Sequence, residues 1–257
     1  MVALHQYKNI SERKSFAAPA LPVPDKAALG IIRDAIGKGQ NALDEYSAKR
    51  LLAAYGIPVS AERLASSRED AVEAGGSIGY PVALKVCDHE IMHKTESGMV
   101  MLNVKSADEA GAAFDLIRQR AGKNVPVLVS SMIKGERELL AGVVRQPGFG
   151  PCVLFGLGGI FAEALNDTTF RVAPLSARDA EEMADDLRSG RLLGNFRKMP
   201  AIDRQKTADL LQKLSLIPIL HPEIAEIDMN PIIFSGPDPV VVDALIVLGK
   251  NENPRLH

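Results

Sequence analysis

The sequence predicts an α+β protein, in which helices and strands mix without a regular repeat. Short β-branched segments and amphipathic helical segments follow one another irregularly, without the βαβ rhythm of a doubly wound sheet. Hydrophobic residues make up 46% of the chain and charged residues 24%, as in an ordinary globular protein. The 257 residues are enough for one large domain or for two lobes that share a core.

Helices are expected where a capping residue precedes an amphipathic stretch. Asp44 begins the first strong helix and Gly56 ends it, while Ser67 and Ser176 cap two others that end near residues 79 and 187. Further helices are expected over residues 25–37, 106–121 and 203–215. β-branched segments between turn residues predict strands over residues 59–64, 82–86, 99–104, 125–133, 136–144, 152–155, 161–165, 168–175, 224–234 and 240–247.

Residues 1–40 are predicted to form an N-terminal arm or linker. The stretch SFAAPALPVPD is rich in alanine and proline and has no usable hydrophobic period. Such a segment can join this region to another domain.

The balance of charge argues against several classes of partner. A net charge of −2 is not that of a nucleic-acid-binding protein. No apolar stretch has the length of a membrane span, and no basic amphipathic helix suggests membrane-surface binding. Cys87 and Cys152 lie far apart in apolar segments and are interpreted as reduced core residues. The expected location is the cytoplasm.

Most of the chemistry is expected in the segment VALKVCDHEIMHKTESGMV, residues 82–100. It reads as a strand ending at Lys85, a polar loop with His93 and Lys94, and a second strand. Cationic side chains and a glycine at a strand end suit an anionic phosphate. Two alternatives stay open: His89-Glu90-Ile91-Met92-His93 fits the zinc motif H-E-x-x-H, although no helical period follows it, and the loop can also be a solvated surface.

A cation site is expected near the C-terminus. On a strand, Glu226, Asp228 and Asn230 point to one face, and Asp243 stands in the next apolar run. Oxygen ligands with few carboxylates suit Mg²⁺ that also contacts substrate phosphates. The alternative is a solvent-facing strand edge.

Further candidates are weaker individually. Gly158 and Gly159 lie in a glycine-rich turn that no helix follows, so a dinucleotide fingerprint is excluded, but its amides can approach phosphate oxygens. Glu138, Glu163 and Arg171 stand inside apolar runs, as partners of ion pairs or as contacts of a nucleotide.

Taken in order, Lys85, the HKT loop, LVSSM, GERELLAGV, FGLGGIFAEAL, FRVAPL, EIDMNP and VVVDA resemble the ATP-grasp subunit of NDP-forming acyl-CoA synthetases. The resemblance covers roughly residues 40–250 and implies an ATP-grasp fold of two α+β lobes that clasp a nucleotide. It places the first lobe at residues 41–129, with a phosphohistidine loop at 86–98, and the second at residues 130–257.

The resemblance also implies roles for individual residues. His93 matches the histidine that is transiently phosphorylated, and Asn230 and Asp243 match magnesium ligands, to which we add Glu226. The implied nucleotide contacts are Lys85, Met92, Lys94, Ser130, Met132, Ile133, Glu138, Gly158, Gly159, Glu163 and Arg171. The chain departs from relatives in Glu96-Ser97, where a glycine pair is common, and in its two interlobe serines.

The implied activity interconverts acyl-CoA, phosphate and ADP with the free acid, CoA and ATP. It requires ATP or ADP, Mg²⁺ and a CoA-binding alpha subunit or domain, which this chain lacks. Two alternatives are a non-catalytic regulatory ATP-grasp module of an acyltransferase fusion and an ATP-grasp carboxylate–amine ligase.

Overall fold

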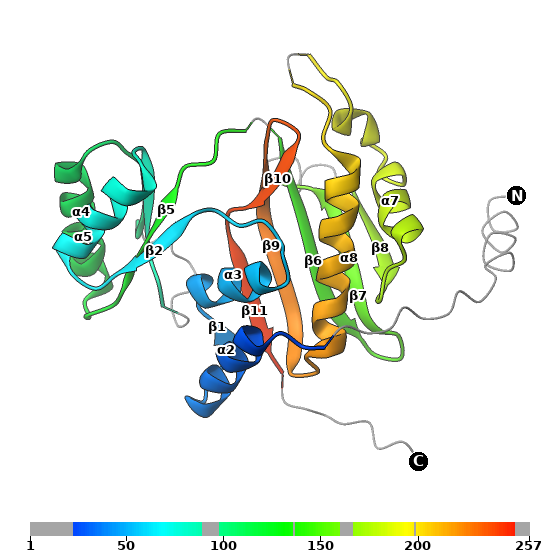
Figure 1. The fold of residues 1–257 in the computed structure, drawn as a ribbon, viewed down its shortest axis with the longest axis horizontal. Helices are drawn as coiled ribbons and strands as arrows, with labels where there is room; N and C mark the ends of the chain where they lie inside the picture. Colours follow the sequence, from blue (N-terminus) through cyan, green and yellow to red (C-terminus); the bar gives the residue numbers. More distant parts are fainter. Residues whose placement is uncertain (1–22, 89–97, 136, 160–166, 198, 250–257) are drawn as a thin grey trace, which may run out of the picture.

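The computed structural model describes residues 23–88, 98–135, 137–159, 167–197 and 199–249 and contains two antiparallel sheets. The smaller sheet has the strand order β2-β5-β3-β4 and is packed against α4 and α5 (Figure 1). Its elements are β2 (Glu62–Ala65), α4 (Arg68–Ile78), β3 (Val82–Val86), β4 (Val100–Val104), α5 (Ala107–Ala121) and β5 (Val127–Ser131).

The larger sheet has the order β1-β11-β9-β6-β7-β8, and β10 also pairs with β9. Its strands are β1 (Ala42–Leu43), β6 (Glu138–Gln146), β7 (Gly150–Leu157), β8 (Thr168–Val172), β9 (Ile224–Ser235), β10 (Asp238–Val241) and β11 (Ala244–Leu248). The helices of this lobe are α2 (Lys26–Gly37), α3 (Glu45–Ala54), α7 (Ala177–Asp185), the short 3-10 helix η1 (Gly190–Leu193) and α8 (Arg204–Leu220).

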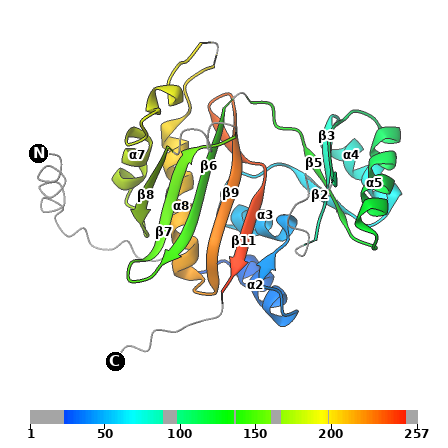
Figure 2. The ribbon, with the colours of Figure 1, turned by 180° about the vertical axis from the view of Figure 1, so that it is seen from behind.

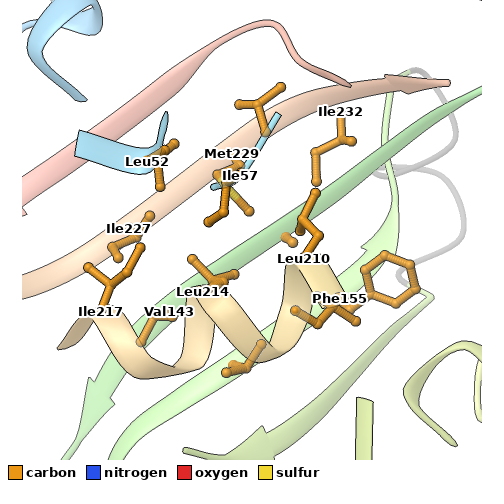
Figure 3. Packing of buried hydrophobic residues seen from close by; sticks show 14 of the residues in the cluster. Leu52, Ile57, Val143, Phe155, Leu210, Leu214, Ile217, Ile227, Met229 and Ile232 are labelled. Atoms are coloured by element: carbon orange, nitrogen blue, oxygen red, sulfur yellow. The ribbon is translucent and has the colours of Figure 1, made fainter. Parts of the chain in front are cut away.

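One face of the larger sheet carries the main core. Leu210, Leu214 and Ile217 of α8 pack against Ile227 and Met229 of β9 (Figure 3). Because side chains alternate along a strand, the residues between them point to the opposite face. Figure 2 views the molecule from behind Figure 1 and so shows this opposite face, with β6, β7 and β9 in front of α8.

Local capping explains where the helices begin. The Asp44 side chain accepts a hydrogen bond from the Ser47 amide at 2.9 Å, and Ser67 and Ser176 form capping boxes with Asp70 and Asp179. Except for the strand expected over residues 240–247, the expected helices and strands within the described residues are present, with ends shifted by a few residues. The strand expected over residues 161–165 lies outside the described residues.

The lobe boundaries differ from those expected. Residues of α2 and α3, among them Ile32 and Leu51, belong to the core of the larger sheet, whereas the smaller core runs from Ala65 to Val129. Residues 26–57 are therefore a part of the larger lobe, and the prediction that residues up to 40 form an arm fails for α2. The physical reason is that α3 packs against β11 and α2 packs against α3 and β1, so their apolar faces are buried in the larger lobe.

Two element boundaries were also predicted wrongly. The strand expected over residues 240–247 is broken at Val242 and Asp243, where the Val242 carbonyl turns to accept hydrogen bonds from lysine side chains. Helix α8 continues to Leu220 through Pro218, because Ile217 extends its buried apolar face. Within the described part of the chain, every helix is too short or too polar to span a bilayer.

Candidate functional site at the junction of the lobes

Lys85 stands where the two lobes meet. It lies in β3, and its side chain is only 8% exposed. Its ammonium donates to Glu45 Oε1 at 2.8 Å, to Asp243 Oδ2 at 3.3 Å and to the Val242 carbonyl at 3.5 Å. Since Glu45 and Asp243 belong to the larger lobe, one lysine of the smaller sheet joins both lobes.

A second lysine, Lys49 of α3, lies deeper in the same cluster and is fully buried. Its ammonium is 3.0 Å from Glu45 Oε1, 3.3 Å from Ser60 Oγ and 3.1 Å from the Val242 carbonyl, and it forms an ion pair with Glu62. Three ammonium hydrogens are thus surrounded by four oxygen acceptors. Such a buried charge is tolerated because it is paired and hydrogen-bonded.

Burial and neighbouring charges have different net effects on the pKa values of Lys85 and Glu62. Burial alone lowers the pKa of Lys85, but the charges of Glu45 and Asp243 outweigh it, so the net pKa is raised and the ammonium stays protonated. Burial raises the pKa of Glu62 to about 7, although Lys49 opposes that shift. The site therefore presents a permanent cation toward Asp243.

The expected alternation of polar side chains on β9 is confirmed. Glu226, Asp228 and Asn230 are exposed, and the residues between them are buried. The pKa of Asp228 is raised to about 6 by desolvation and by the negative charges of Glu226 and Asp243. This face of the sheet is therefore acidic on the side away from α8.

Asn230 and Asp243 are brought to neighbouring positions. Ala244 begins β11 opposite Met229, so Asp243 and Asn230 are the next residues beyond that pair. The β6–β9 register shifts between Leu139 and Ala141, opposite this part of β9. Bulges of this kind re-aim side chains at functional sites.

Glu226 does not converge with Asn230. The two residues are four positions apart on β9, which corresponds to about 13 Å along an extended strand. This spacing does not support the prediction of Glu226 as a ligand of the same magnesium.

The oxygens of Asn230 and Asp243 nevertheless fit a hard cation. Among the residues that the structure describes, no three His, Cys, Asp or Glu side chains form a metal-binding group. Mg²⁺ characteristically uses one or two carboxylates and leaves other positions to water and substrate phosphates. An amide and a carboxylate beside a buried ammonium match that pattern, and not a closed all-protein cage.

The glycine turn and Glu138 come together at the start of β6. The Gly158 amide donates to the Glu138 carbonyl at 2.9 Å, and a side chain on Gly158 would collide with the Leu139 backbone. Gly159 has a φ of +62°, and an added Cβ would meet the Glu138 carboxylate. Close approach and positive φ therefore require these glycines, and the exposed Glu138 stands directly beside them.

The segment that joins the lobes follows β5. Ser130 is buried between Glu62 and Ala83 of the neighbouring strands, and Met132 and Ile133 are half-buried beyond the strand end. A side chain on Gly135 would collide with the backbone of Phe234, so the crossing is packed against β9. The backbone of residues 131–133 is therefore held at the interlobe junction, while the Ser130 side chain is enclosed in the smaller sheet.

Arg171 is not brought to this junction. It forms an ion pair with Asp186 after α7, and its neighbour in β7, Val153, belongs to the core that faces the helices. Strand alternation therefore places Arg171 on the helix side of the sheet, away from Asp228. The prediction of Arg171 as a nucleotide contact is not supported by this placement.

Four predicted site residues lie outside the described residues. They are Met92, His93 and Lys94 of the loop and Glu163. The zinc alternative, which needs His89 and His93, lies there too. The described residues on either side of this segment are Asp88, which follows β3, and Gly98, which precedes β4. These two strands pair, with Lys85 opposite Val100.

Sequence reasoning missed the buried ion-pair cluster behind Lys85, which is formed by Glu45, Lys49 and Glu62. A signal was present, because Glu45, Lys49 and Leu52 are spaced i, i+4 and i+7 and share the buried face of α3. Two charged residues on a buried helical face require partners, and those partners come from distant parts of the chain.

Comparisons with known proteins agree with this architecture. Residues 34–248 match the family model described as an ATP-grasp domain. The chain is 40% identical over 230 residues to the acetate–CoA ligase (ADP-forming) II subunit beta of Pyrococcus furiosus, covering 86% of this chain and 98% of that protein. It is also 38% identical over 205 residues to acetate–CoA ligase (ADP-forming) I of Archaeoglobus fulgidus, covering 78% of this chain and 30% of that longer protein.

The fold has close counterparts among solved structures. The dinucleotide-forming acetyl-coenzyme A synthetase 1 of Candidatus Korarchaeum cryptofilum, in complex with coenzyme A and Ca-AMPCP, superposes with a TM-score of 0.83 at 38% identity. The match covers 86% of this chain and all of that one. A further structure of that enzyme with Mg-AMPPCP has its phosphohistidine segment pointing towards the nucleotide site and gives a TM-score of 0.78. The chain belongs to the ATP-grasp family, in the group formed by the beta subunits of ADP-forming acyl-CoA synthetases.

Proposed function

We propose that this chain binds ATP and ADP between its lobes and transfers a phosphoryl group through His93. It would thereby perform the nucleotide half of the reaction of an ADP-forming acyl-CoA synthetase. The observation that carries the proposal is the meeting of Lys85 from the smaller lobe with Asp243 from the larger lobe, at 3.3 Å.

The nucleotide would contact groups from both lobes. Lys85 offers a permanent cation to the phosphates, and the turn at Gly158 and Gly159 offers backbone beside Glu138. The interlobe backbone near Met132 and Ile133 would contact the adenine. Met92, Lys94 and Glu163 remain predicted nucleotide contacts, as the family resemblance implies.

Asn230 and Asp243 would hold Mg²⁺ on the exposed side of β9. When bound, this ion would offset the negative charge of the nucleotide phosphates. The Asp243 carboxylate also lies 3.3 Å from the Lys85 ammonium, so this protein cation and the metal would act on one phosphate chain.

The chemical step would be a covalent phosphoryl relay. A neutral ring nitrogen of His93 attacks the γ-phosphorus of ATP with its lone pair. The new N–P bond forms as the bond from that phosphorus to the bridging oxygen breaks, and ADP leaves. In the reverse direction, ADP takes the phosphoryl group back from His93. Lys85 and Lys94 would offset the charge that develops on the transferring group.

The acyl half would belong to a CoA-binding alpha subunit or fused domain. An acyl phosphate formed there would phosphorylate a histidine of the partner, from which the group passes to His93. The acetate–CoA ligases that resemble this chain make a small carboxylic acid the substrate class to test first. Cys87 and Cys152 are buried and form no disulfide with each other, which fits a reducing compartment, and the cytoplasm is the predicted location.

The two rival functions have less support. A regulatory ATP-grasp module would not need His93 to accept phosphate, and a carboxylate–amine ligase would use a free acyl phosphate. The curated relatives named above are acetate–CoA ligases, which favours the relay.

The test is covalent labelling with Mg²⁺ and ATP that is labelled at the γ-phosphate. We expect an acid-labile, alkali-stable label on the wild-type chain and none on His93→Ala. The neighbouring His89→Ala, in the same loop, is the matched control and should keep the label. Binding of ATP without any label on the wild type would contradict the relay and favour the regulatory module or the carboxylate–amine ligase.

A further inference from the structure

One carboxylate oxygen holds both buried lysines of the junction. Glu45 Oε1 accepts from Lys85 at 2.8 Å and from Lys49 at 3.0 Å. The Glu45 side chain is 1% exposed, so its charge is screened little by water. Glu45 therefore stands behind Lys85 and does not itself face the open side of the junction.

The hydrogen bond to Glu45 is the shortest that the Lys85 ammonium donates in the described part of the chain. The other two acceptors, Asp243 and the Val242 carbonyl, are 3.3 and 3.5 Å away. The Asp243 side chain is 40% exposed, and under the proposed function it also serves the metal. The buried Glu45 carboxylate is therefore the partner that can hold the Lys85 ammonium both before and after the nucleotide binds.

Lys49 in turn fixes Glu45. The Lys49 ammonium is held from other sides by Ser60 Oγ at 3.3 Å and the Val242 carbonyl at 3.1 Å, besides its ion pair with Glu62. Because Lys49 is fully buried, it cannot reach a nucleotide, and its partners leave it little freedom to move. Lys49 thus connects Glu45 to the Val242 carbonyl, in the break between β10 and β11, and limits the movement of the Glu45 carboxylate.

The braced carboxylate also connects the lobes. Glu45 begins α3, which packs in the larger core, whereas Lys85 is a residue of the smaller sheet. A contact of 2.8 Å between them sets where the Lys85 ammonium lies relative to Asp243. Such pre-orientation matters, since a cation that is already placed loses less freedom when a phosphate binds.

We propose that Glu45 is a positioning residue of the nucleotide site, which holds the Lys85 ammonium beside Asp243 to receive a phosphate of the bound nucleotide. The inference rests on the proposed function, because it takes Lys85 as the phosphate contact. It assigns to Glu45 no contact with the nucleotide.

The test compares two ligands that differ in their phosphates. Dissociation constants of ADP and adenosine are measured by calorimetry, in the presence of Mg²⁺, for the wild type, Glu45→Gln, Lys85→Met and the double variant. Glu45→Gln keeps the size of the side chain and removes its charge. We expect it to weaken ADP binding by about tenfold, the loss typical of a misplaced charge-assisted hydrogen bond, and to leave adenosine binding unchanged. In the Lys85→Met background the same change should have no further effect on ADP.

Glu62→Gln is the matched control, since it makes the same chemical change in the same buried cluster without touching Lys85. It should keep the wild-type preference for ADP over adenosine. A purely structural role of Glu45 would instead weaken both ligands together. If circular dichroism shows that Glu45→Gln does not fold, Glu45→Asp replaces it, because its shorter side chain withdraws the carboxylate from Lys85.

The outcomes separate the two claims. ADP binding by the wild type with an unchanged ligand preference in the Glu45 variant overturns the inference and leaves the proposed function standing. Fully additive losses in the double variant overturn it as well. If the wild type does not bind ADP, both the proposed function and the inference fall.

Discussion

Lys49 and Lys85 share one carboxylate oxygen of Glu45, yet their surroundings differ. Lys49 is fully buried and surrounded by four oxygen acceptors, whereas Lys85 lies at the edge beside the 40% exposed Asp243. The inner lysine can act only on the protein, while the outer one can also meet a ligand. Exposure of the partner, more than the type of residue, therefore separates a charge that stabilises the fold from a charge that binds.

The largest effect is expected from Lys49→Met. Removal of this ammonium leaves Glu45 and Glu62 buried with one cation fewer, which should lower the free energy of unfolding by about 3–5 kcal/mol. Chemical denaturation measures the loss. The matched control is Lys206→Met, because Lys206 is 56% exposed and pairs with Asp203 and Asp238, so water screens these pairs and the loss should be much smaller. Equal losses in the two variants would remove the distinction between a buried and an exposed pair.

Lys85→Met should weaken nucleotide binding more than it lowers stability, whereas Lys49→Met should mainly lower stability. A charge-assisted contact with phosphate contributes about 1.5–3 kcal/mol, so ADP affinity should fall roughly ten- to a hundredfold. Adenosine affinity should not change. Calorimetry with both ligands checks this, and an equal loss for adenosine would mean that the lysine supports the lobe junction and not the phosphates.

Glu62→Gln should reveal the inner part of the cluster through pH. Because burial raises the folded pKa of Glu62 from 4.5 to about 7, the native state binds more protons than the unfolded state between these values. The wild type should therefore lose stability as pH rises through this window, by on the order of 1–3 kcal/mol. Denaturation at pH 5 and pH 8 should show a smaller loss for Glu62→Gln. An identical pH dependence would contradict the raised pKa.

The smallest effect is expected on the open face of β9. Asn230→Ala should raise several-fold the Mg²⁺ concentration that half-maximal ADP binding requires, because it removes one oxygen ligand. Glu226→Ala, on the same face of the same strand, should leave that concentration unchanged. A shift caused by Glu226→Ala alone would reverse the assignment of the metal site.

Much of the fold could be predicted from local patterns. Caps such as Asp44 and Ser67 marked helix starts, and the alternation from Glu226 to Asn230 showed which side of β9 is open. Such signals lie within one element, so spacing and propensity are enough to read them.

The remaining features depend on contacts between distant residues. Glu45 and Lys85 are forty positions apart, and Lys49 and Val242 are separated by 193. No local pattern indicated that α3 packs with the larger sheet, or that Lys49 and Lys85 would donate to the Val242 carbonyl where the last strand breaks. Likewise, Arg171 stood in an apolar run, but its face was settled only by the pairing of β7 with β8.

The most direct test of the relay is isotope exchange between ADP and ATP by the chain alone. The wild type, incubated with Mg²⁺, ATP and labelled ADP but without acid, CoA or a partner subunit, should move the label into ATP. His93→Ala should not, because each exchange requires a phosphoryl group to rest on that histidine. Exchange that persists in His93→Ala, or is absent from a wild type that binds both nucleotides, would contradict the phosphohistidine relay.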